Sequence, residues 1–188
     1  VMASLPDVSK ISCAVLPTIA DNYRLLSSGA ALGRGNGPLL VRRKGEQGSI
    51  NRIAVPGEHT TANALIGRLF PDIKERVPML FSRIAEAVER GEFDAGVLIH
   101  EGRFVYERRN LELVADLGVE WERQTSLPLP LGAIVMRREL SQELYERFDR
   151  VLHRSIEYAF AHPAQSRDYI KAHAQELEDS VIDKHIAL

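Results

Sequence analysis

The 188-residue sequence contains a single cysteine, Cys13, and no apolar run approaching the roughly 20 residues that a membrane-spanning helix needs. One cysteine excludes an internal disulfide framework, so we expect a reducing, cytoplasmic setting. The first residues also lack the basic flank and apolar core of a secretory signal. Disulfide-stapled secreted proteins and membrane-spanning proteins are therefore the first classes that the composition excludes.

An excess of positive charge is missing as well. The sequence has 24 Lys and Arg against 26 Asp and Glu, which gives a formal net charge of -2, and only 6% of its residues are aromatic. Nucleic-acid-binding proteins carry basic stripes interleaved with aromatic residues, so we expect no nucleic-acid partner. With 45% hydrophobic residues, the chain can still bury the core of one large domain or two small lobes.

Short apolar, β-branched runs alternate with helical patterns along the chain. This alternation is typical of an α/β fold and predicts mostly parallel sheets. Residues 95–99 are nearly all apolar, as in a strand that is covered on both faces. Thr60 and Thr61 are suited to cap a helix over residues 62–70, and Ser141 is suited to cap a longer helix.

Two segments are typical of crossovers between lobes. Residues 44–49 are polar and contain glycine, whereas the prolines of residues 127–132 exclude a helix there. We predict a first lobe of residues 1–45 and 135–188, with residues 46–134 inserted as the second lobe. Two-lobed α/β proteins bind ligands in the crevice between the lobes, at the carboxyl ends of strands.

His100 follows the apolar run of residues 95–99 and therefore lies at the carboxyl end of a predicted buried strand. Its imidazole could accept a proton from a ligand near neutral pH. The alternative is a structural histidine that is hydrogen-bonded or paired with Glu101.

Hydroxyl groups accompany two further predicted strand ends. Residues 56–62 form a strand–turn–helix start, whose amides and two threonines suit a carboxylate, a phosphate or a polyol. Plain capping accounts for one threonine more easily than for two. Ser12, with Lys10 on the same face of its strand, could add a hydroxyl and a cation.

Other chemistries find little support in the sequence. The six histidines are scattered without the paired helical spacing of a zinc motif, so we expect no metal. Residues 33–37 are glycine-rich but lead into Pro38 and a strand, whereas a dinucleotide-binding loop opens a helix; we interpret them as a turn. Cys13 has no activating partner in the sequence, which favours packing over nucleophilic chemistry.

Three segments in their order and spacing resemble the 1,4-dihydroxy-6-naphthoate synthases of the futalosine route to menaquinone. They are residues 54–63, 93–104 and 127–132, and the resemblance covers nearly the whole chain. It implies the two-lobed fold of type II periplasmic binding proteins and a lyase without metal or organic cofactor. The implied substrate is the small molecule cyclic dehypoxanthine futalosine, which the family converts to 1,4-dihydroxy-6-naphthoate.

The resemblance also implies roles for individual residues. His100 corresponds to the proton acceptor that starts cleavage of the sugar-derived part of the substrate. The implied substrate-binding residues come from both lobes: Lys10, Ile11 and Ser12 from the first, and Thr61 and Ala62 from the second. Backbone amides would explain why the apolar Ile11 and Ala62 belong to this set.

Family members carry an opening strand–helix portion ahead of the segment that matches Val1, so we expect an N-terminal portion to be missing here. The main alternative is a solute-binding protein of the same fold that closes on a small carboxylate without reacting. A second is the chorismate dehydratase of the same pathway, although residues 58–62 favour the synthase. The sequence does not indicate an oligomeric state.

Overall fold

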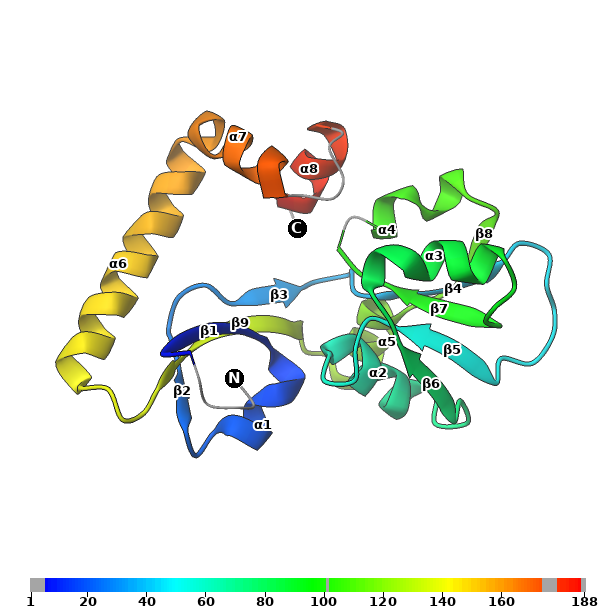
Figure 1. Cartoon of the computed structure of the whole chain (residues 1–188), viewed down its shortest axis with the longest axis horizontal. Helices are drawn as coiled ribbons and strands as arrows, with labels where there is room; N and C mark the ends of the chain where they lie inside the picture. Colours follow the sequence, from blue (N-terminus) through cyan, green and yellow to red (C-terminus); the bar gives the residue numbers. More distant parts are fainter. Residues whose placement is uncertain (1–5, 101, 174–178, 187–188) are drawn as a thin grey trace. The chain divides into compact units, whose positions relative to one another are not determined.

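The computed structural model describes residues 6–100, 102–173 and 179–186 (Figure 1). Its contacts divide the chain into a first unit, residues 1–32 and 130–175, and a second unit, residues 33–129 and 176–188.

The first boundary between the units falls at Leu32, ahead of the crossover predicted near residue 45. The reason is that residues 39–43 form a strand hydrogen-bonded to two others of the second unit. The division into lobes at residues 45 and 135 stays a prediction about domains.

Antiparallel pairing builds the sheet of the first unit. Its strands are β1 (Val8–Ser12), β2 (Tyr23–Leu25), β3 (Ala31–Gly33) and β9 (Leu129–Arg137). The central strand, β9, runs antiparallel to both β1 and β2. Its core includes Ile11, Tyr23 and Val135, and the Tyr23 hydroxyl donates a 2.9 Å hydrogen bond to the carbonyl of Pro6.

The first unit also contains helices. They are the short 3-10 helix η1 (Cys13–Val15), α1 (Leu16–Ile19), α6 (Gln142–Ala161) and α7 (Pro163–His173). The predicted cap of the long helix is confirmed, because the Ser141 hydroxyl accepts a 3.2 Å hydrogen bond from the Leu144 amide.

The second unit contains a five-stranded sheet in the order β6-β5-β7-β4-β8. Its strands are β4 (Leu39–Arg43), β5 (Arg52–Val55), β6 (Glu75–Pro78), β7 (Ala95–Leu98) and β8 (Leu111–Asp116). Its helices are α2 (Thr61–Leu69), α3 (Phe81–Glu89), α4 (Gly102–Val105), the 3-10 helix η2 (Tyr106–Arg108), α5 (Leu117–Thr125) and α8 (Asp179–Ile186).

The prediction of mostly parallel sheets is wrong. Strand β5 runs parallel to β6 and β7, but β4 is antiparallel to β7 and β8, and β1 and β2 are antiparallel to β9 in the first unit. Parallel neighbours require a crossover connection, and α2 and α3 supply one for β5, β6 and β7. Strands β4 and β9 pair with partners that are not joined to them by a crossover helix, so the local alternation of strands and helices did not reveal their direction.

Helices cover both faces of the second unit's sheet. Figure 1 shows α3 on one face and α2 with α5 on the other. Successive side chains of a strand point to opposite faces, and Leu39, Val41 and Ala54 accordingly join Ile84 and Val88 of α3 in one buried cluster. The buried strand predicted over residues 95–99 is confirmed as β7, whose four residues are all buried.

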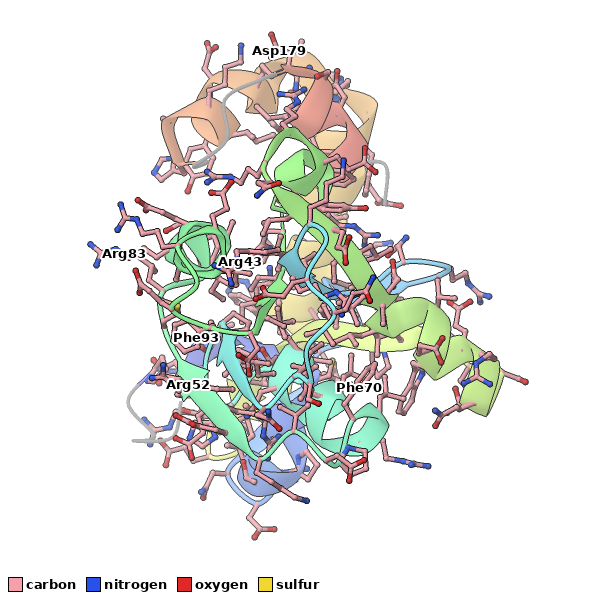
Figure 2. All side chains as sticks on the ribbon, turned by 90° about the vertical axis from the view of Figure 1, so that its right-hand side faces the viewer. Arg43, Arg52, Phe70, Arg83, Phe93 and Asp179 are labelled. Atoms are coloured by element: carbon pink, nitrogen blue, oxygen red, sulfur yellow. The ribbon has the colours of Figure 1, made fainter. Side chains whose placement is uncertain are left out.

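Polar groups close the amino edge of this sheet. The Arg52 guanidinium lies 4.7 Å from the centre of the Phe93 ring, and the two are labelled in Figure 2. Arg52 also pairs with Glu75 at 2.6 Å, and the Asp94 carboxylate accepts 2.8 Å hydrogen bonds from the amides of Asn51 and Arg52. These interactions fix the start of β5.

None of the described helices combines the length and the apolar character that crossing a membrane requires.

Candidate functional site

Two neighbouring parallel strands of the second unit, β5 and β7, end at the same edge of the sheet. Their last residues, Val55 and Leu98, are almost fully buried, with 0% and 3% of their surface exposed. The chain leaves β5 through a turn into α2, and it leaves β7 through a turn into α4. The loops at the carboxyl ends of such strands are the common ligand-binding position of open α/β sheets.

His100 lies in the turn after β7. Its φ of 53° places it in the left-handed region, which residues other than glycine seldom adopt. The turn is held by hydrogen bonds from the Gly102 amide to the Ile99 carbonyl, at 3.2 Å, and from the Arg103 amide to the His100 carbonyl, at 3.4 Å. Unfavourable backbone conformations of this kind are concentrated at functional sites, so the geometry motivates a functional hypothesis for His100.

His100 is exposed, and its ring makes an edge-type contact with an aromatic neighbour. The ring centres of His100 and Phe81 are 5.4 Å apart, with an angle of 67° between the planes. An exposed imidazole beside an apolar ring can exchange protons with a bound molecule. The alternative partner proposed from the sequence, Glu101, lies outside the described residues.

The two threonines after β5 have different roles. Thr60 is the N-cap of α2: its hydroxyl oxygen accepts a 3.2 Å hydrogen bond from the Asn63 amide, and its hydroxyl donates a 2.8 Å bond to the Gly57 carbonyl. Thr61 is the first residue of the helix and is half-buried. Capping therefore accounts for Thr60, as the plain interpretation allowed, whereas Thr61 is the first residue of the helix and not its cap.

Ala62 is 2% exposed, so its methyl group belongs to the core. Only its backbone can serve a ligand, and its amide lies in the first turn of α2, where N–H groups have no partner within the helix. This first turn also carries the positive end of the helix dipole, which favours an anionic or oxygen-rich group.

The first unit holds the other three predicted site residues at the end of β1. Lys10 is exposed, Ile11 packs its side chain into the core, and Ser12 is half-buried. Ser12 precedes η1 but makes no capping hydrogen bond to it, so its hydroxyl is not committed to that helix. Ile11, like Ala62, can contact a ligand only through its backbone.

The structure thus brings His100, Thr61 and Ala62 to one edge of one sheet, and it places Lys10 and Ser12 at a strand end in the other unit. The meeting of the two groups in a single crevice stays a prediction.

Sequence reasoning missed an ion pair at the same edge of the second unit. Arg103 Nη2 and Asp116 Oδ2 are 3.2 Å apart, and both side chains are 15% exposed. Leu39 is paired with Leu98 on one side and with Asp116 on the other, so β7 and β8 end at the same edge of the sheet, on either side of the start of β4. An aspartate ahead of a helical pattern could have revealed Asp116 as a cap, but nothing in the sequence joins it to Arg103.

Two pKa shifts bear on which groups could react. Burial, followed by the charge of Glu107, raises the pKa of the Tyr106 phenol, and Arg103 acts in the opposite direction. Burial also raises the pKa of the Cys13 thiol, which disfavours its nucleophilic thiolate form and supports the packing interpretation. Among the residues that the structure describes, no three His, Cys, Asp or Glu gather as metal ligands would.

A family model described as menaquinone biosynthesis matches residues 1–188. Two curated relatives bear the name 1,4-dihydroxy-6-naphthoate synthase. The relative from Thermus thermophilus is 47% identical over 180 residues, covering 95% of this chain and 66% of its own length. The relative from Streptomyces coelicolor is 43% identical over 188 residues, covering 97% of this chain and 67% of its own length. The chain therefore spans about two thirds of the length of these relatives.

Solved structures agree with this relationship. A crystal structure of an Archaeoglobus fulgidus protein is 39% identical with a TM-score of 0.91, covering 97% of this chain and 69% of that one. A Candida albicans gene product with the generic periplasmic binding protein fold is 12% identical with a TM-score of 0.64, covering 95% of this chain and 62% of its own. This second likeness concerns the fold alone, and it confirms the predicted α/β fold class of periplasmic binding proteins.

Proposed function

Because the chain belongs to the menaquinone biosynthesis family, we propose that it performs the lyase reaction of the 1,4-dihydroxy-6-naphthoate synthases. In this proposal, cyclic dehypoxanthine futalosine is the substrate and His100 is the base. The proposal includes the cytoplasmic setting and the independence from metal and organic cofactors that were expected from the sequence.

The observation that carries the proposal is the arrangement at the carboxyl edge of β5 and β7. A histidine with a left-handed backbone follows one strand, and the N-terminus of α2 follows its parallel neighbour. The first feature supplies a proton acceptor, and the second supplies donors for an oxygen-rich anion. A lyase that acts on a polyhydroxylated carboxylate needs both.

In the proposed mechanism, His100 accepts a proton from the sugar-derived part of the substrate, which starts its cleavage from the ring system that leaves as dihydroxynaphthoate. The Thr61 hydroxyl and the amides at the start of α2 orient the substrate through its oxygen atoms. Lys10 and Ser12, with the backbone of Ile11, contribute from the first unit if the two units close on the substrate. Closure would exclude water before the proton moves.

The direct test is incubation of the chain with cyclic dehypoxanthine futalosine and detection of 1,4-dihydroxy-6-naphthoate by chromatography. The Thermus thermophilus relative serves as the positive control, because it bears the name of the enzyme. Turnover would support the lyase. Tight binding without turnover, under conditions in which the control is active, would favour the solute-binding alternative.

Thr61→Val is expected to raise KM about tenfold with little change in kcat, because it removes one hydrogen bond to the substrate while keeping the shape of the side chain. Steady-state kinetics measure the effect. Thr61→Ser is the matched control, since it keeps the hydroxyl and should retain a KM close to that of the wild type. A serine variant as impaired as the valine variant would show that the hydroxyl is not what binds.

A further inference from the structure

We propose that Arg103 and Asp116 are positioning residues for His100, and that their ion pair holds the histidine turn against the N-terminus of α5. This inference rests on the proposed function for its kinetic consequences but not for its structural ones.

Arg103 is the last residue of the turn that carries His100, because its amide donates to the His100 carbonyl at 3.4 Å. The left-handed conformation of His100 is unfavourable for a residue with a Cβ atom, so interactions outside the turn must maintain it. The Arg103 side chain supplies such an interaction, because it pairs with Asp116 while its own backbone amide closes the turn.

The two carboxylate oxygens of Asp116 accept hydrogen bonds from different partners. Oδ1 accepts hydrogen bonds from the amides of Gly118, at 2.8 Å, and Val119, at 3.2 Å, whereas Oδ2 accepts one from the Arg103 guanidinium. The next amide, that of Leu117, donates to the Pro38 carbonyl at 2.9 Å. Asp116 is therefore fixed to α5 and to the sheet before it meets Arg103.

The side chains of Arg103 and Asp116 are each 15% exposed, whereas those of the Arg109–Glu89 pair in the same unit are 42% and 26% exposed. A sheltered charge-assisted hydrogen bond is less weakened by water and salt than an exposed one. Removing either partner also leaves the other charge sheltered from water without its counterpart, which is unfavourable in free energy. The ion pair therefore stabilises the observed geometry of the turn.

The expected consequence of breaking the pair is a shift of the His100 ring rather than a loss of the fold. The His100 ring is in edge-type contact with the Phe81 ring, with centres 5.4 Å apart, so the NMR signals of His100 report on the position of its ring. A displacement of the order of 1 Å at a reacting group can lower turnover by about a hundredfold.

The experiment compares Arg103→Met and Asp116→Asn with the wild-type chain. Asparagine is a good N-cap, so Asp116→Asn keeps the cap of α5 while removing the charge. In both variants we expect a changed chemical shift and titration curve for the His100 imidazole, assigned with His100→Gln, and a kcat lowered by about ten- to a hundredfold with KM within about twofold. Arg103→Lys should restore part of kcat, because it keeps the cation.

The matched control is Arg109→Met, which removes a 2.8 Å ion pair with Glu89 in the same unit. It should leave both the imidazole signals and kcat unchanged. Thermal unfolding of each variant shows whether the fold is kept.

The proposal is overturned if the His100 signals of Arg103→Met and Asp116→Asn match those of the wild type, whatever happens to turnover. A lowered kcat with unchanged signals would instead mean that Arg103 contacts the substrate itself. If the wild-type chain shows no turnover at all, the proposed function fails, and the NMR comparison still decides whether Arg103 and Asp116 position the histidine.

Discussion

Replacing His100 with glutamine is expected to lower kcat about a thousandfold while substrate affinity stays within a few-fold of the wild type. Glutamine has a similar size and can hydrogen-bond, but it cannot accept a proton at neutral pH. The left-handed backbone of His100 also tolerates polar residues better than β-branched ones. Product formation measures kcat, and calorimetric titration with the substrate measures binding.

His59→Gln is the matched control for this variant. His59 is exposed in the turn between β5 and α2, beside the proposed substrate site, and it is assigned no role there. The same chemical change at His59 should leave kcat within about twofold of the wild type, as for most surface substitutions. Retention of substantial turnover by His100→Gln would rule out His100 as the base and leave the lyase without one.

Gly118→Ala is expected to destabilise the protein by about 3 kcal/mol, the upper end of the usual cost of overpacking. An added Cβ at Gly118 would lie 2.7 Å from the Gly37 amide nitrogen, and the Asn36 carbonyl is closer still. A Cβ at Gly37 would in turn lie 2.6 Å from the Gly118 Cα. Both obstacles are backbone atoms rather than flexible side chains, so relief requires moving the start of α5 away from the segment before β4.

Urea-induced unfolding of the chain measures this effect as a lower midpoint. Gly48→Ala is the control, because an added Cβ there meets nothing within 4 Å and Gly48 is not among the glycines with positive φ. That variant should be neutral or slightly stabilised, since alanine reduces the freedom of the unfolded chain. Equal midpoints for the two variants would mean that α5 does not need the close approach of its backbone to Gly37.

The start of α5 also connects stability with the candidate site. Gly118 donates its amide to Asp116, and Asp116 pairs with Arg103 of the histidine turn. A displaced helix start would therefore weaken the ion pair as well. We expect the residual folded fraction of Gly118→Ala to show a shifted His100 signal in the same direction as Asp116→Asn.

Features that depend on a few consecutive residues could be predicted from the sequence. Ser141 and Thr60 cap helices because a hydroxyl at a helix start reaches an amide three residues ahead, and both caps are confirmed. The buried strand β7 was recognisable because four consecutive small or apolar residues are needed where both faces are covered. His100 was found for the same reason, since it follows that strand directly.

Features that join distant parts of the chain could not be predicted in this way. The direction of β4 depends on its pairing with β7 and β8, which lie more than 50 residues further along. The contact between His100 and Phe81 and the ion pair between Arg103 and Asp116 arise from the same pairing of distant strands and helices. No local pattern encodes them.

The glycine-rich segment of residues 33–37 shows the division most clearly. The residues themselves favour a turn over a dinucleotide-binding loop, because Pro38 and a strand follow where a helix would have to begin. That Gly37 must be glycine has a different cause, the Gly118 backbone packed against it from α5. Backbone freedom and helix capping act within a few residues, so they can be predicted from the sequence. The space left for a side chain depends on which segments meet after folding, so only the tertiary structure decides it.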